Sequence, residues 1–107
     1  MTINIRHRGI ELTEAIKAYV QKKTEVLAKY AGLVRHADIE VGKTTAHHKN
    51  GDVFVCRALF ELEHGGTMRI DREAKDLYKA IDKVHDHARQ ELGEHHRQML
   101  TRAEAPA

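Results

Sequence analysis

The sequence predicts a small α+β domain, a two-layer sandwich in which a four-stranded sheet carries two helices on one face. Three observations predict it. The chain has 107 residues, enough for one domain with a modest core. Its apolar residues change period in the order strand, helix, three strands, helix. Both helical segments are amphipathic, so each needs a sheet to cover its apolar stripe. This β-α-β-β-β-α order resembles the double-stranded-RNA-binding domain with one strand added in front.

The first two elements are a strand and a helix. Apolar and polar residues alternate over residues 2–6, as in a short strand. Thr13 offers an N-cap hydroxyl to a helix over residues 13–30, which Gly32 is placed to stop. The apolar face of this helix consists of Ile16, Tyr19, Val20, Leu27 and Tyr30.

The middle of the chain predicts three strands in succession. A period of two marks strands over residues 35–45 and 54–62 and a third around 68–70. The pairs Asn50-Gly51 and Gly65-Gly66 are typical of the tight turns between such strands. The inward positions are Ala37, Ile39, Val41, Phe54, Cys56, Ala58, Phe60, Leu62, Met68 and Ile70. Short turns between consecutive strands indicate an antiparallel meander.

A second helix is predicted over residues 72–99, with Asp71 as its cap. Its apolar stripe consists of Leu77, Ala80, Ile81, Val84, Ala88 and Leu92. Residues 101–107 show no periodicity and are expected to form a disordered tail, which leaves residues 1–100 as a single domain.

Composition excludes several classes of protein. No apolar stretch is long enough to cross a bilayer, and the first residues contain no signal-peptide run, so we expect a cytoplasmic protein. Cys56, the single cysteine, occupies an inward strand position and is expected to be a buried core thiol. Gly65-Gly66 is not followed by a helix start with a lysine, so there is no phosphate-binding loop. We therefore expect neither an enzyme nor a bound cofactor.

The nine histidines raise the question of a metal site. His85 and His87 point about 200° apart on a helix, but His87, Glu91 and His95 lie on one stripe. Two of these could bind zinc or nickel, yet such clusters are common on solvated helix surfaces. A histidine-rich metal-binding or scaffold protein remains an alternative, although no metal site is predicted.

Basic residues follow both predicted helices. At 100° per residue, Arg72, Lys79 and Arg97 share one flank of the second helix, bordered by Lys75 and Lys83. On the first helix Lys22 and Lys29 lie on one side, with Lys23 close to the apolar stripe. Two parallel basic flanks can follow a phosphate backbone. The tyrosines Tyr19, Tyr30 and Tyr78 are expected to face the core, so recognition of RNA by phosphate and shape is favoured over base stacking.

Two motifs resemble those of the ribosome hibernation-promoting factor family, which includes the ribosome-associated inhibitors once called sigma-54 modulation proteins. The first is Asn4-Ile5 followed by residues 10–16, Ile-Glu-Leu-Thr-Glu-Ala-Ile. The second is residues 76–82, Asp-Leu-Tyr-Lys-Ala-Ile-Asp, similar to the family's D-[LM]-Y-x-A-I-D segment. The resemblance covers about residues 2–92.

The resemblance implies a ribosome-binding domain that occupies the decoding channel of the small subunit. There it would block messenger RNA and the tRNA A and P sites, inhibiting translation under stress or in stationary phase without any catalytic residue. Its partners would be the small subunit, its ribosomal RNA and intact ribosomes, with no membrane and no small-molecule substrate, and the isolated protein would be a monomer. Lys23 matches a lysine typical of the family's first helix, and Arg89 stands one residue before an expected arginine. The RNA-binding residues expected from flanks and resemblance together are Lys22, Lys23, Lys29, Arg72, Lys75, Lys79, Lys83, Arg89 and Arg97.

The end of the chain departs from the family pattern. His87, Glu94 and His96 stand where lysines are expected. Since imidazoles titrate near pH 6.5, protonation of four histidines is a hypothesis for tighter binding in an acidified cell; they are His85, His87, His95 and His96. The chain stops at Ala107 and so resembles the short form of the family or a truncated long form. Promotion of inactive ribosome dimers is slightly favoured over idling of single ribosomes, and an RNA-binding protein acting away from the decoding channel remains an alternative.

Overall fold

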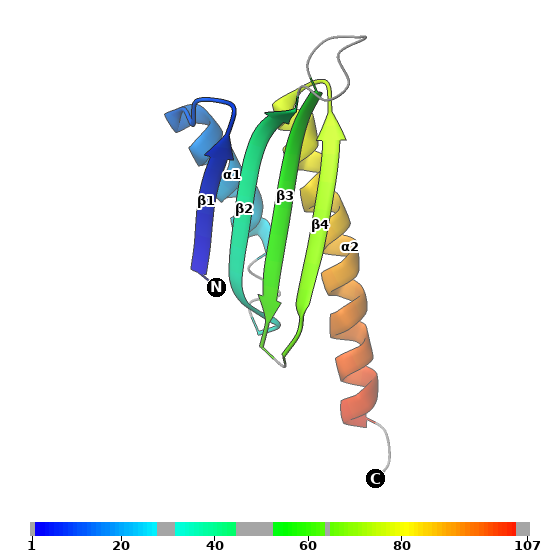
Figure 1. Cartoon of the computed structure of the whole chain (residues 1–107). Coiled ribbons are helices and arrows are strands. Elements are labelled where there is room, and N and C mark those ends of the chain that lie inside the picture. The colour runs from blue at the N-terminus through cyan, green and yellow to red at the C-terminus, as the bar shows by residue number, and fades with distance from the viewer. Residues whose placement is uncertain (1, 28–31, 45–52, 64, 105–107) are drawn as a thin grey trace.

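The computed structural model describes residues 2–27, 32–44, 53–63 and 65–104. The elements are β1 (Thr2–Arg8), α1 (Glu14–Glu25), β2 (Val34–Thr44), β3 (Val53–Leu62), β4 (Thr67–Ala74) and α2 (Leu77–Glu104). The strands form one sheet in the order β1-β2-β3-β4, and both helices cover the same face of it (Figure 1). The predicted α+β sandwich and its element order are confirmed.

The register of the strands follows from their apolar alternation. β1 pairs with β2 in parallel, so that Ile3 lies beside Ala37 and Ile5 beside Ile39. This parallel pairing requires a crossover, which α1 provides. β2, β3 and β4 form the predicted antiparallel meander.

The core lies between the helix-facing side of the sheet and the two helices. Its largest fully buried side chains are Phe60, Leu92, Val20, Val34, Val41 and Cys56. Burial raises the pKa of the Cys56 thiol to about 12, because a thiolate would be poorly solvated there. The expectation that Cys56 is a buried core thiol is therefore confirmed.

The first helix is shorter than predicted. α1 begins after Thr13, whose hydroxyl accepts a hydrogen bond from the Ile16 N–H at 3.2 Å, but it ends at Glu25. In its last turn the Thr24 hydroxyl donates to the Val20 carbonyl, a local bond that competes with regular helix geometry. The remainder of the predicted helix falls largely on residues 28–30, which lie outside the described residues, as does the predicted Asn50-Gly51 turn.

The second helix begins later than predicted, at Leu77, so Asp71 is not its cap. β4 continues to Ala74, which pairs with Phe54 of β3. The backbone of residues 72–74 therefore belongs to the sheet. Asp76 takes the capping role, since its carboxylate accepts the Tyr78 N–H at 2.8 Å.

The helix also ends later than predicted, at Glu104 instead of Met99. Residues 101–104 of the expected tail are helical, and residues 105–107 lie outside the described part of the chain. Thr-Arg-Ala-Glu contains neither glycine nor proline, so nothing in it breaks the helix. In the described residues no helix is long and apolar enough to cross a membrane.

The Gly65-Gly66 turn is confirmed. Both glycines have positive φ angles, 88° and 84°, which residues with a Cβ rarely adopt. The Leu62 N–H donates to the Gly66 carbonyl at 3.1 Å, which closes the hairpin between β3 and β4.

Candidate nucleic-acid interface

Four of the predicted lysines lie on the two neighbouring helices. Lys22 and Lys23 belong to the last turn of α1, and Lys79 and Lys83 to the first two turns of α2. The helices contact each other along the face of the sheet (Figure 1). Lys22 and Lys79 are exposed, and their side chains make no hydrogen bond or ion pair within the described residues. They are therefore available to a phosphate, as are Lys75 and Arg89, which are also exposed and have no such partner among the described residues.

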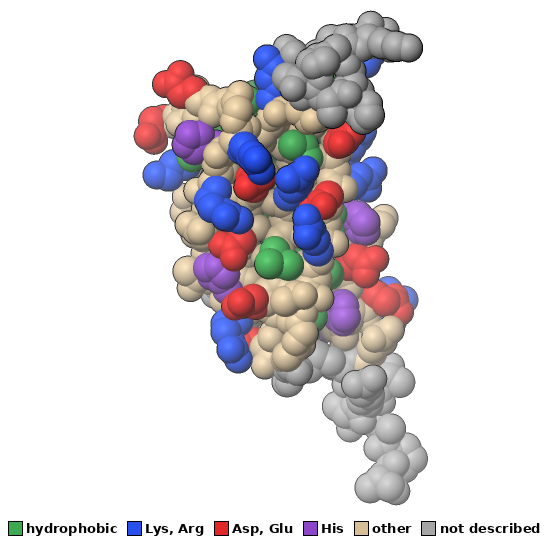
Figure 2. Space-filling view, viewed as in Figure 1, with side chains coloured by type: hydrophobic (Ala, Val, Ile, Leu, Met, Phe, Trp, Pro, Cys, Tyr) green, Lys and Arg blue, Asp and Glu red, His purple; other side chains and the backbone are tan. Residues whose placement is uncertain are grey.

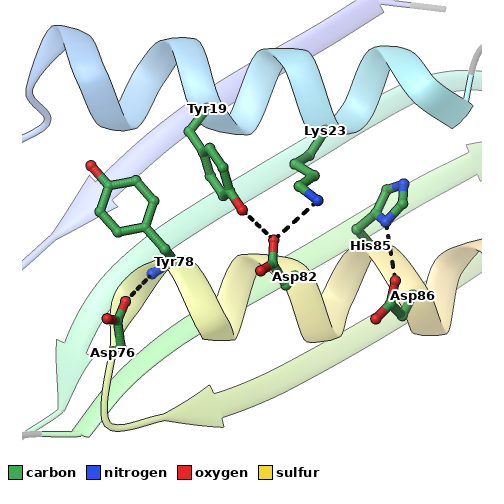
Figure 3. A network of polar contacts seen from close by, with 7 residues as sticks. All are labelled: Tyr19, Lys23, Asp76, Tyr78, Asp82, His85 and Asp86. Atoms are coloured by element: carbon green, nitrogen blue, oxygen red, sulfur yellow. Dashed lines mark hydrogen bonds and ion pairs between the residues drawn. The ribbon is translucent and has the colours of Figure 1, made fainter.

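A polar cluster joins the two helices (Figure 3). The Tyr19 hydroxyl of α1 donates to the Asp82 carboxylate of α2 at 2.5 Å, and the Lys23 ammonium lies 3.3 Å from the same oxygen. Lys23 also sits 5.6 Å from the centre of the Tyr19 ring. We call Tyr19, Lys23 and Asp82 the interhelix clamp. It holds the basic flanks of α1 and α2 in one geometry, and it partly neutralises Lys23.

The clamp changes the ionisation of Tyr19. The hydrogen bond to Asp82, then burial and the charge of the same carboxylate, raise the pKa of Tyr19 to about 12. The hydroxyl therefore remains a donor throughout the neutral and mildly alkaline range. Asp82 accepts this hydrogen bond in addition to its ion pair with Lys23, and the two contacts fix the carboxylate between the helices.

Lys83 is tied to the sheet. Its ammonium donates to the carbonyl of Glu73, near the end of β4, at 3.1 Å. This contact anchors the second turn of α2 beside the strand that precedes it. Lys75, in the bend between β4 and α2, is exposed.

The predicted position of Arg72 is wrong in one respect, because Arg72 is on β4 and not on a helix flank. Its side chain reaches α2 nevertheless, with a guanidinium nitrogen 3.5 Å from Nδ1 of His87. Because β4 runs beside α2, Arg72 is still on the helix side of the sheet, although partly covered.

Charges of both signs share the C-terminal half of α2. Arg97 lies 3.2 Å from Glu94, and His87 lies 3.6 Å from Glu91. Arg89 is exposed. Among the described side chains of α2, the fixed cations without an ion pair are therefore Lys79, Lys83 and Arg89. The remaining predicted residue, Lys29, lies outside the described residues.

The four histidines of the proposed pH response occupy different environments. His85 points toward α1 (Figure 3), its side chain is only 10% exposed, and its Nδ1 lies 3.3 Å from Asp86. Its Nε2 is buried without a partner among the described residues. His96 is exposed, whereas His87 and His95 are partly covered. Of the four histidines, only His87, His95 and His96 are therefore accessible to RNA.

Neither a metal centre nor a strongly basic sheet face competes with the helices. In the described parts of the chain, no three side chains of histidine, cysteine, aspartate or glutamate are grouped to hold a metal ion. On the open sheet face, Arg57 lies 3.6 Å from Glu40 and Arg69 lies 3.3 Å from Asp71. Figure 2 views this face and shows blue and red side chains interleaved. Such mixed charge attracts a polyanion weakly.

Tyr78 is more exposed than the sequence predicts. It was expected to face the core, but it is 40% exposed in the first turn of α2, beside Tyr19. A helical wheel carries the signal, because Tyr78 lies about 120° from the centre of the apolar stripe at Val84. Tyr19, in contrast, packs against the core as predicted, and Tyr30 lies outside the described residues.

Fold and surface thus define the class of protein: a small α+β domain with two helices on one sheet face and lysines along both helices. The model of the Sigma 54 modulation protein / S30EA ribosomal protein family matches residues 3–100. The chain belongs to this family, as the two sequence motifs predict.

Two curated relatives illustrate the match. The chain is 28% identical over 95 residues to the ribosome hibernation promotion factor of Bacillus subtilis, and 28% identical over 97 residues to the ribosome hibernation promoting factor of Escherichia coli K12. Each alignment covers 89% of this chain. The chain spans about half of the Bacillus protein, 48%, but 93% of the Escherichia protein.

Solved structures agree with the fold. The N-terminal domain of Thermus thermophilus Protein Y superposes with a TM-score of 0.72 at 28% identity, covering 86% of this chain and 96% of that one. A ribosomal subunit interface protein from Coxiella burnetii has a TM-score of 0.77 at 18% identity, covering 91% and 99%. The second likeness concerns the fold alone.

Proposed function

We propose that this domain inactivates ribosomes by occupying the decoding channel of the small subunit. In that position it excludes messenger RNA and the tRNAs of the A and P sites, and so inhibits translation under stress or in stationary phase. The action is steric and requires no catalytic residue. Its site of action is the cytoplasm, and its partners are ribosomal RNA, the small subunit and intact ribosomes.

The observation that carries the proposal is the exposed lysine pair on adjacent helices in a chain of this family. Lys22 and Lys79 project from α1 and α2 without partners in the described residues, while the clamp holds the two helices together. Lysine ammonium groups bind phosphates as point charges, and binding releases condensed counterions. Exposed lysines on two neighbouring helices suit the backbone of structured RNA, whereas the open sheet face mixes basic and acidic side chains, two pairs of which form ion pairs.

A competition experiment tests the proposal. Purified small subunits carrying a fluorescent messenger RNA are titrated with the protein, and polarisation reports the bound RNA. We expect displacement that reaches completion at one protein per subunit. Binding of the protein without displacement would indicate an RNA site away from the decoding channel and would contradict the proposal.

A sedimentation experiment separates the two outcomes for whole ribosomes. Purified ribosomes are run on a sucrose gradient with and without the protein. We favour promotion of inactive ribosome dimers, which predicts a peak heavier than the single ribosome. A protein that cosediments only with single ribosomes would support inhibition without pairing.

A further inference from the structure

Tyr78 is an exposed aromatic ring on the side of the molecule that carries the lysines. Three large hydrophobic side chains are exposed in the described residues, namely Val26, Leu59 and Tyr78, and Tyr78 is the aromatic one. Its neighbour Lys79 is exposed as well. An uncovered aromatic ring loses favourable burial energy unless something packs on it.

Contacts of both the ring and the backbone hold Tyr78 in place. The ring of Tyr19 meets it in an edge-to-face arrangement, with centroids 4.9 Å apart and planes inclined by 78°. Tyr19 is itself fixed by its hydrogen bond to Asp82 (Figure 3). The backbone of Tyr78 is fixed by its N–H bond to the Asp76 carboxylate at 2.8 Å. A ligand that packs on Tyr78 therefore pays little conformational entropy to order it.

We propose that Tyr78 is a stacking platform for one unpaired nucleobase of the RNA bound by α1 and α2. This inference rests on the proposed function and adds a base contact to a surface otherwise suited to phosphates. Aromatic rings flanked by lysines are the usual elements of single-strand recognition, since every base presents a π face and each is followed by a phosphate. In this arrangement Lys79 and Lys22 bind the adjacent phosphates, and Tyr78 remains 40% exposed in spite of its contact with the Tyr19 ring.

The test is a substitution series at Tyr78, measured as affinity for purified small ribosomal subunits at several salt concentrations. Tyr78→Phe keeps a ring and should bind like the wild type, and Tyr78→Trp should bind at least as tightly. Tyr78→Leu should lower the affinity about tenfold, which is within the range found when an aromatic side chain that stacks on one base is replaced. The slope of log affinity against log salt should not change, because no phosphate contact is removed.

Leu59→Ala is the matched control, since Leu59 is 37% exposed and lies on the opposite, open face of the sheet. Its affinity should equal that of the wild type. Thermal melting checks that each variant folds. If the leucine variant does not fold, the affinities of Tyr78→Phe and Tyr78→Trp are compared, since both variants keep an aromatic ring. The inference is overturned by unchanged binding of Tyr78→Leu, by equal losses in the phenylalanine and leucine variants, or by a weaker salt slope. Absence of wild-type binding would overturn the proposed function as well, so the two failures are distinguishable.

Discussion

Replacing Asp82 by asparagine should destabilise the domain while making its helix side more positive. Asp82 is the acceptor of the interhelix clamp, bound to the Tyr19 hydroxyl at 2.5 Å and to the Lys23 ammonium at 3.3 Å. The asparagine side chain has nearly the same shape and keeps one acceptor oxygen. The substitution therefore removes the charge and leaves the packing intact.

The magnitude follows from the two contacts. A hydrogen bond to a charged group contributes about 1.5–3 kcal/mol, and one to a neutral group about 1 kcal/mol. The Lys23 pair is partly exposed, with 34% and 42% of its side chains accessible, so it contributes about 0.2–1 kcal/mol. We expect Asp82→Asn to lower the free energy of unfolding by about 1–2 kcal/mol, or the melting temperature by roughly 5–10 °C.

Urea denaturation at neutral pH measures this loss. Asp86→Asn is the matched control, because Asp86 is 68% exposed and its one ion pair among the described residues is with His85 of its own helix. The control should change stability by less than about 0.5 kcal/mol. Tyr19→Phe, alone and combined with Asp82→Asn, gives a double-mutant cycle with a coupling energy of about 1 kcal/mol. Equal stabilities for both asparagine variants, or zero coupling with Tyr19, would refute the clamp.

Three further outcomes are expected. The pKa of Tyr19 is raised from 10.0 to about 12, so the stabilisation that its hydroxyl provides is fully present below pH 10 and is lost as the pH rises toward 12. In urea titrations the difference in stability between wild type and Tyr19→Phe should therefore shrink between pH 10 and pH 12. A constant difference would contradict this prediction. Cys56 should react with a thiol reagent at pH 8 orders of magnitude more slowly in the native protein than in urea, and rapid native labelling would show that it is not buried. Gly42→Ala should lower the free energy of unfolding in urea by about 1–3 kcal/mol, because the new Cβ would lie 2.7 Å from the Arg8 carbonyl oxygen. Gly32→Ala is the control, since a Cβ there meets nothing within 4 Å, and it should show no such loss of stability.

Periodicity predicted the fold because each element buries one side. Only one register of β1 against β2 lets the apolar side chains of both strands face the helices, namely Ile3 beside Ala37 and Ile5 beside Ile39. A slip of either strand by one residue would expose them. The boundary between β4 and α2 was predicted wrongly because it depends on a distant partner. Asp71 and Asp76 are both suitable caps, and pairing of β4 with β3 up to Ala74 decides between them.

The candidate site was predictable in composition but not in geometry. Helical spacing placed lysines on the flanks of both helices, since this depends on one helix at a time. The clamp joins Tyr19 to Asp82, 63 residues apart, and depends on how α1 and α2 pack together. The exposure of Tyr78 could be predicted only by giving its position on the helical wheel more weight than its aromatic character.

The central claim is that the helix side of the molecule, and not the open sheet face, binds the small subunit. The most direct test compares Lys22→Gln/Lys79→Gln with Arg8→Gln/Arg69→Gln, two variants with equal loss of charge on opposite faces. Affinity for purified small subunits is measured against salt concentration. The lysine variant should bind more weakly, with a salt slope smaller by about 1–2, and the arginine variant should match the wild type. Equal losses in both variants, or a loss confined to the arginine variant, would contradict the account.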